Sequence, residues 1–180
     1  MRSWGEIARR VRVPLGFAFA VFYVWLARPT WPSLVAGGII CVPGLALRAL
    51  ASGHVRKNSS LTTTGPYAFT RNPLYLGSLI LAGGFAVAAR SIWIALVIVA
   101  LFAGIYVPVV RGEEEFLRRK FPEFGDYERR VPRFLPRWAP AQASLGRFSP
   151  QLYWKHREYN ALLGAGAMMA ALACKMICFR

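Results

Sequence analysis

The chain has 180 residues, the length of one domain, and 56% of them are hydrophobic, which excludes an ordinary soluble domain of this size. The 23 Lys and Arg residues against 8 Asp and Glu residues give a net charge of +15, which suits nucleic acid or a membrane surface. Because the basic residues lie between apolar runs, we predict a multi-pass membrane protein with no nucleic-acid partner.

Five apolar segments predict an all-α integral membrane bundle of about five transmembrane helices. Their approximate ranges are 13–28, 33–50, 73–89, 91–110 and 160–178. Several are slightly shorter than the roughly 20 residues that cross a hydrocarbon core. We expect a single domain over 1–180. It divides into a first hairpin in 1–50, a core in 51–138 and a C-terminal segment with the last span in 139–180.

The distribution of charge predicts the orientation in the membrane. If the N-terminus, residues 48–72 and residues 111–159 share one side, that side holds every acidic residue and all Lys and Arg residues except four. These four are Arg28, Arg90, Lys175 and Arg180. Positive loops stay in the cytoplasm, so we predict that this side is cytoplasmic, with the N-terminus in and the C-terminus out.

A polar segment, residues 62–75, precedes the third apolar run. Gly65-Pro66 predicts a turn with a positive φ at the glycine, and Pro73 suits the first turn of a helix. The loop then presents four side chains at a helix N-terminus, whose free N–H groups favour an anion such as a carboxylate. They are Tyr67, Arg71, Asn72 and Tyr75. The alternative is a membrane re-entry in which Arg71 reaches lipid phosphates and the tyrosines form an interfacial belt.

An acidic cluster, Glu113–Glu115, follows Arg111 at the end of the fourth apolar run. Carboxylates at this place could accept hydrogen bonds from ribose hydroxyls or bind a ligand ammonium. The alternative is a solvated acidic face that pairs with Arg118 and Arg119. On the predicted topology the acidic cluster and the polar segment face the same compartment, so we expect them to share one site.

The stretch after the acidic cluster is polar but contains regularly placed apolar residues. Glu113 to Phe121 predicts a short helix that ends at Pro122. Beyond it, we expect apolar side chains to pack against the membrane face and arginines to reach lipid head groups. The apolar residues are Tyr127, Val131, Phe134, Leu135 and Trp138, and the arginines are Arg129, Arg130, Arg133 and Arg137.

Other catalytic or metal-binding patterns are missing from the sequence. Cys41, Cys174 and Cys178 lie in apolar stretches without Cys-x-x-Cys or Cys/His spacing, so we predict no metal site. His54 and His156 are isolated, and there is no Ser/His/Asp triad and no phosphate-binding loop.

Three motifs in order along residues 48–138 resemble the isoprenylcysteine carboxyl methyltransferase family, which belongs with the membrane phospholipid methyltransferases. They are Leu61-Thr-Thr-Thr-Gly-Pro-Tyr67 with Arg71-Asn-Pro73 and Tyr75, then Glu113-Glu114 with Leu117, then Phe121, Tyr127, Val131-Pro132 and Pro136. The resemblance implies an integral membrane enzyme that uses S-adenosyl-L-methionine in a pocket facing the cytosol. Residues 51–138 would then be the cofactor-binding core.

The resemblance also implies roles for individual residues. Leu61 and Thr62 would contact the cofactor from the approach loop, and Glu113 would hold its polar end. Arg71 would lie near the transferred methyl group and the acidic group of the substrate. The remaining pocket residues would be Tyr67, Asn72, Pro73, Leu74 and Tyr75.

Two positions depart from the family pattern. The family often has Arg-His-Pro, and here Asn72 replaces the histidine, so no protonatable group remains at this place. The family's substrate-contacting arginine one turn before the glutamates is Val109 here, and Arg111, two residues later, is the candidate for that contact. This departure argues against a prenylcysteine substrate.

The sequence therefore predicts a methyltransferase acting on a lipophilic acceptor, either a small molecule or a lipid-modified one, in contact with membrane lipids. A carboxylate acceptor needs only Arg71 to position it, whereas an amine acceptor needs a base such as Glu114 or Tyr75. The scarcity of bases favours the carboxylate. The alternatives are a phospholipid amine N-methyltransferase, a membrane NADPH-dependent sterol-type reductase and a scaffold without enzymatic activity. Residues 148–157 either cover the acceptor groove or anchor the chain at the interface.

Overall fold

The computed structural model describes residues 18–56, 59–141 and 146–178, and within these ranges the regular elements are all helices. Residues 18–26 are helical. They are followed by α2 (Trp31–His54), the 3₁₀ turn η1 (Gly65–Ala68), α3 (Pro73–Ala89), α4 (Ile92–Leu101), the π-helical turn η2 (Phe102–Tyr106), α5 (Val107–Lys120), α6 (Phe124–Arg130), α7 (Pro150–Lys155) and α8 (Tyr159–Cys178). The prediction of an all-α chain is confirmed for these residues.

Three helices of the described part are long and apolar enough to cross a membrane: α2, the continuous helix Ile92–Lys120 and α8. The apolar helix α3 has 17 residues and is shorter. Residues 1–17, which hold the start of the first predicted span, lie outside the described residues. The chain therefore has the helices of a multi-pass membrane protein, while the number of five spans stays a prediction.

One predicted boundary is wrong. Glu113 to Phe121 is no separate short helix, because α4, η2 and α5 form one continuous helix of 29 residues. Pro108 lies in the first turn of α5, directly after the π-helical turn. This helix is about 44 Å long, so its last turns extend beyond a hydrocarbon core of about 30 Å.

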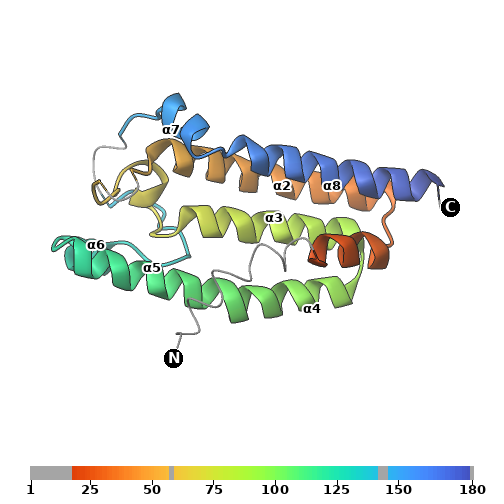
Figure 1. The fold of residues 1–180 in the computed structure, drawn as a ribbon, viewed down its shortest axis with the longest axis horizontal. Coiled ribbons are helices and arrows are strands. Elements are labelled where there is room, and N and C mark those ends of the chain that lie inside the picture. The colour runs from red at the N-terminus through yellow and green to blue at the C-terminus, as the bar shows by residue number, and fades with distance from the viewer. Residues whose placement is uncertain (1–17, 57–58, 142–145, 179–180) are drawn as a thin grey trace.

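The helices run side by side, with α3 between the α2–α8 pair and the long helix α4–α5 (Figure 1). The tight hairpin connections lie at one end of the bundle, near the C-terminus. The polar loop before α3, the end of α5, α6 and α7 gather at the other end. One end of the bundle therefore carries the polar loop and the additional short helices, and we call it the polar end.

Glycines let α2 and α3 touch through their backbones. A Cβ atom on Gly37 would lie 2.5 Å from the carbonyl oxygen of Gly84, and one on Gly44 would lie 2.9 Å from that of Gly77. Close contact of this kind is typical of helix pairs in membranes. It fixes the N-terminus of α3 against α2.

Polar contacts hold the hairpin end together. Thr30 and Ser33 form a capping box at the start of α2, and Ser33 Oγ also donates to the carbonyl of Ala88 at 3.0 Å. The ammonium of Lys175 on α8 donates to the carbonyls of Val24, Trp25 and Ala27 at 2.7, 2.7 and 2.8 Å. These carbonyls end the helix over 18–26, so the lysine satisfies acceptors that have no partner within that helix.

Candidate functional site

A cavity of about 300 Å³ opens at the polar end of the bundle. Its walls come from the end of α2, the loop before η1, the start of α3, α5 and α6. Ten of the residues predicted for the site line it: Leu61, Thr62, Tyr67, Arg71, Asn72, Pro73, Leu74, Tyr75, Glu113 and Glu114. The structure thus brings the polar segment and the acidic cluster to one cavity.

Arg111 is the predicted site residue that does not line this cavity. Its side chain is exposed. Successive residues of an α-helix are rotated by about 100°, so Arg111 is turned by roughly 200° from Glu113 and lies one turn before Glu114. The predicted contact between Arg111 and a substrate stays a prediction.

Local backbone rules shape the loop that carries the predicted residues. Gly65 has a φ of +60°, as predicted, and a Cβ there would lie 2.5 Å from Cδ2 of His54. Pro73 occupies the first turn of α3, also as predicted. Between them, the backbone N–H of Arg71 donates to the carbonyl of Pro132 at 2.9 Å. The loop is therefore held by α2 on one side and by the chain after α6 on the other.

Arg71 is buried in an ion-pair network and does not reach lipid phosphates. Its side chain is 9% exposed, and its Nη1 donates to Oε1 of Glu128 at 2.5 Å. Its Nε lies 3.6 Å from Oε1 of Glu114 and has no hydrogen-bond partner among the described residues. Glu128 also accepts from Nη2 of Arg118 at 2.6 Å. The membrane re-entry alternative is thus wrong for Arg71.

Glu114 is the centre of the same network. Its carboxylate is 4% exposed and accepts from Nδ2 of Asn72 at 2.8 Å and from Nε and Nη2 of Arg133 at 2.9 and 2.8 Å. Asn72 also donates to the carbonyl of Arg133 at 3.2 Å. Within the described residues the Asn72 side chain makes no capping hydrogen bond to the start of α3, and its Nδ2 donates to Glu114 and Arg133 instead.

Glu113 differs from its neighbours on α5. One of its oxygens accepts from the hydroxyl of Tyr75 at 2.8 Å, and within the described ranges it takes part in no ion pair. Glu115, by contrast, is exposed and pairs with Arg119, as the solvated-face alternative predicted for the whole cluster. Glu113 therefore places a carboxylate with only a neutral partner at the cavity wall.

Apolar and phenolic side chains form the remaining wall. Phe124, Tyr127 and Val131 make a buried cluster with Leu61, Leu117 and Phe121 packed against it. The hydroxyl of Tyr127 donates to the carbonyl of Tyr67 at 2.8 Å. Burial raises the pKa of both phenols, so both stay protonated at neutral pH.

Several residues of the site were not predicted, or were placed elsewhere. Arg133 pairs with Glu114 and does not reach lipid head groups, and Tyr127 and Val131 are buried beside the cavity and not at the membrane face. Glu128 joins Arg71 to Arg118, and these two guanidinium groups lower the pKa of its carboxyl, with Arg118 contributing most. The spacing of Phe124, Tyr127 and Val131 is helical and was the one available signal that this face is buried.

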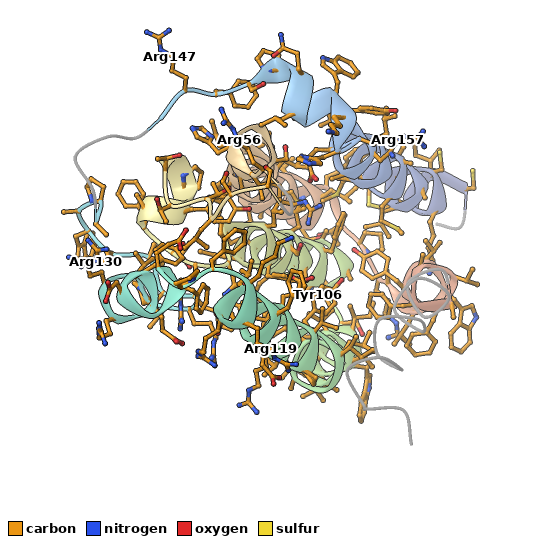
Figure 2. All side chains as sticks on the ribbon, turned by 60° about the vertical axis from the view of Figure 1, so that its left-hand side comes forward. Arg56, Tyr106, Arg119, Arg130, Arg147 and Arg157 are labelled. Carbon is orange, nitrogen blue, oxygen red and sulfur yellow. The ribbon has the colours of Figure 1, made fainter. Side chains whose placement is uncertain are left out.

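The segment after residue 146 packs on the end of α2 next to the cavity. The backbone N–H of Ser149 donates to the carbonyl of Gly53 at 2.9 Å, and Glu158 pairs with Arg48 of α2 at 2.6 Å. A second cavity of about 330 Å³ lies between this segment and the loop, and shares Arg56, Ser60, Leu61 and Thr62 with the first. Arg119, Arg130 and Arg147 project outward around this end of the molecule (Figure 2).

Part of the chain is similar to known proteins. The model of the phospholipid methyltransferase family matches residues 44–123. The chain is 44% identical over 82 residues to the nickel-cobalt-cadmium resistance protein NccN of Alcaligenes xylosoxydans xylosoxydans. It is 43% identical over 82 residues to the cobalt-zinc-cadmium resistance protein CzcN of Cupriavidus metallidurans.

Both alignments cover only part of each protein. They span 46% of this chain and 38% of each relative, so the chain matches well under half the length of these relatives. No solved structure shows a significant match to the chain. In the part of the chain that the structure describes, no group of three or more His, Cys, Asp or Glu residues could hold a metal ion.

Proposed function

We propose that the chain is an integral membrane methyltransferase that uses S-adenosyl-L-methionine and transfers a methyl group to a lipophilic acceptor. The observation that carries the proposal is the cavity that the 61–75 segment and α5 line together beside helices of membrane length. The family match over residues 44–123 includes both of these segments. Isoprenylcysteine carboxyl methyltransferases belong to this wider group. We include in the proposal that the chain is an enzyme of this type.

The cavity residues fit the proposed cofactor in charge and polarity. The cofactor supplies an electrophilic methyl group bound to a positively charged sulfur. Within the described part of the chain, the Glu113 carboxylate accepts a hydrogen bond from the Tyr75 hydroxyl and is in no ion pair, which suits an ammonium or ribose hydroxyls. Leu117, Phe121 and Phe124 offer an apolar wall that excludes water from a heterocycle.

Arg71 is placed to bind an anionic acceptor. Its guanidinium is held by Glu128 on one side, while its buried Nε donates to no acceptor among the described residues. A buried donor without a partner is costly, and an acceptor oxygen would remove that cost. This supports a carboxylate acceptor, which is already a nucleophile and needs only desolvation and alignment.

Glu114 is better suited to positioning than to proton transfer. Both of its oxygens accept hydrogen bonds, one from Asn72 and the other two from Arg133. Its oxygens are therefore engaged with protein donors, and a general base needs an oxygen within hydrogen-bond reach of the proton it takes. We therefore propose that Glu114 fixes Asn72 and Arg71 at the cavity wall, in place of the catalytic role expected from the sequence.

A phospholipid amine N-methyltransferase is the second candidate, because the matching family is described as phospholipid methyltransferases. Such an acceptor must lose a proton during transfer. Within the cavity the phenols of Tyr67 and Tyr127 have raised pKa values, so neither is an effective base at neutral pH. This chemistry makes the amine acceptor the less favoured of the two.

The names of the two relatives suggest a setting for the activity. Each is described as a resistance protein for cobalt, cadmium and a further metal. We propose that the methyl transfer contributes to tolerance of such metals. Cells lacking the protein would then grow less well with cadmium or cobalt, and a Glu113→Gln variant would fail to restore growth.

The direct test is ligand binding by the purified full-length protein in detergent. Radiolabelled S-adenosyl-L-methionine should bind and should be displaced by S-adenosylhomocysteine but not by NADPH. Binding of NADPH alone would favour the reductase, and binding of neither ligand would remove the enzyme proposal. With binding established, labelled methyl groups should enter base-labile esters of membrane lipids, and label in phosphatidylethanolamine would favour the amine acceptor.

The proposed orientation has its own test. The cavity should face the cytoplasm, with the N-terminus in and the C-terminus out. A membrane-impermeant thiol reagent applied to intact cells should label a cysteine placed at the exposed Arg90 and not one placed at the exposed Arg119. The reverse pattern would invert the topology.

A further inference from the structure

Residues 131–141, which we call the strap, run beside the loop that forms the cavity. Three backbone hydrogen bonds join them: Arg71 N–H to the Pro132 carbonyl at 2.9 Å, Arg137 N–H to Phe69 at 3.0 Å and Ala141 N–H to Ala68 at 2.9 Å. The hydroxyl of Thr70 also donates to the carbonyl of Arg133 at 3.0 Å. The position of the strap therefore sets the position of the loop over residues 68–72.

The opposite face of the strap is apolar and open. Leu135 is 81% exposed, and Trp138 is fully exposed. Phe134 lies in the sequence between the strap residues that contact the loop, and its ring packs against that of Phe102 with centroids 5.8 Å apart. Phe102 belongs to the membrane-length helix Ile92–Lys120, so the strap lies against a helix that enters the bilayer. Exposed tryptophan is enriched at membrane–water interfaces.

Two arginines beside this face are not neutralised by carboxylates. Arg130 donates to the backbone carbonyl of Asp126, and Arg137 donates to that of Arg130. Within the described ranges neither guanidinium belongs to an ion pair, in contrast to Arg118, Arg119 and Arg129. Arg130 projects from the surface at this end of the molecule (Figure 2). Two guanidinium groups that are in no ion pair with a described residue, close in the chain to exposed apolar side chains, match the phosphates and acyl chains of an anionic lipid surface.

We propose that the strap docks on the anionic surface of the bilayer in which the chain is embedded. Leu135 and Trp138 enter the interface, while Arg130 and Arg137 bind lipid phosphates. Because the strap is hydrogen-bonded to the cavity loop, docking orders the loop as well. Lipid charge thereby regulates the site, whatever ligand the cavity takes.

The docking is tested with the full-length protein in nanodiscs, either of phosphatidylcholine alone or with one third of the lipid replaced by phosphatidylglycerol. The Trp138 signal is the emission of the wild type minus that of Trp138→Phe. Lipids brominated near the head group should quench this signal, more strongly in the anionic nanodiscs. The double variant R130Q/R137Q should lose the dependence on lipid charge, whereas Arg119→Gln, whose partner Glu115 is exposed, should keep it.

The coupling is tested by amide hydrogen exchange in the same nanodiscs. Exchange of the Arg71, Arg137 and Ala141 amides should slow several-fold when anionic lipid is present, and R130Q/R137Q should abolish the slowing. Equal exchange in both lipids would overturn the coupling. Quenching of Trp138 by aqueous acrylamide but not by brominated lipid would overturn the docking. Quenching of Trp138 by neither reagent would also overturn it, because the side chain would then contact protein. Neither measurement needs the proposed cofactor, so failure of the enzyme proposal would leave these results interpretable.

Discussion

The guanidinium of Arg133 donates two hydrogen bonds to one oxygen of Glu114, from Nε at 2.9 Å and from Nη2 at 2.8 Å. The other oxygen accepts from Asn72 at the start of α3. Glu114 thus joins α5, the polar loop and the strap at one buried point. This contact links the polar loop and the acidic cluster to the strap, which contains the Val131-Pro132 and Pro136 positions of the third motif.

Replacing Arg133 by glutamine should destabilise the protein, because the buried Glu114 side chain would lose its two hydrogen bonds from a charged partner. We expect a loss of about 1–3 kcal/mol, measured as a lower unfolding temperature in detergent. Arg119→Gln is the matched control, since it breaks an exposed ion pair on the same helix that contributes less than about 1 kcal/mol. Equal losses for the two variants would show that the buried Arg133–Glu114 pair contributes no more to stability than an exposed ion pair.

Glu113→Gln should weaken binding of S-adenosyl-L-methionine without lowering the unfolding temperature. Its carboxylate faces the cavity, and losing a charged hydrogen-bond acceptor would raise the dissociation constant by about 10- to 100-fold. Glu115→Gln, two residues further along the same helix but exposed, should bind like the wild type. Unchanged affinity in Glu113→Gln would assign the proposed cofactor to another part of the molecule.

The shape of the cavity loop was predictable because its signals are local. A glycine before a proline predicts a turn, and a proline after a polar run predicts the first residue of a helix. The positive φ of Gly65 and the place of Pro73 follow from those rules. The distribution of charged residues predicted that the loop and the acidic cluster lie on the same side of the membrane, and residues of both line the cavity.

The partners of the charged residues were not predictable in the same way. Arg129, Arg130, Arg133 and Arg137 stand in similar polar surroundings in the sequence, yet only Arg133 pairs with Glu114. Which of these arginines pairs with Glu114 depends on how the strap packs beside α5. This packing is a tertiary contact that no local sequence pattern predicts. The predicted boundary after the fourth apolar run was wrong for a related reason. The helix Ile92–Lys120 continues past its apolar part and includes the acidic cluster.

The α2–α3 contact should be sensitive to a single methyl group. In Gly37→Ala the new Cβ would lie 2.5 Å from the Gly84 carbonyl oxygen and 2.7 Å from the Cβ of Ala88, so the helices would have to separate. We expect a loss of about 1–3 kcal/mol, seen as a lower unfolding temperature. Gly38→Ala is the control on the next residue, where a Cβ meets nothing within 4 Å. Destabilisation of the control to the same extent would indicate a backbone effect and not the helix contact.

Glu128 should make stability depend on pH in the acidic range. Hydrogen bonds from Arg118 and Arg71 lower the pKa of its carboxyl in the folded protein. In the unfolded chain the carboxyl titrates near its ordinary value of about 4.3. A carboxyl with a depressed folded pKa contributes stability that is fully present above the unfolded value and is lost as the pH falls through the folded pKa.

The wild type should therefore unfold at a higher temperature than Glu128→Gln at neutral pH, and the difference should shrink once the pH falls below about 4. Thermal scans of both proteins across this range in detergent would measure it. Glu115→Gln, which removes an exposed pair, should differ little from the wild type at any pH. A wild-type advantage that persists unchanged in acid would mean that packing of the Glu128 side chain, and not its charge, joins Arg71 to Arg118.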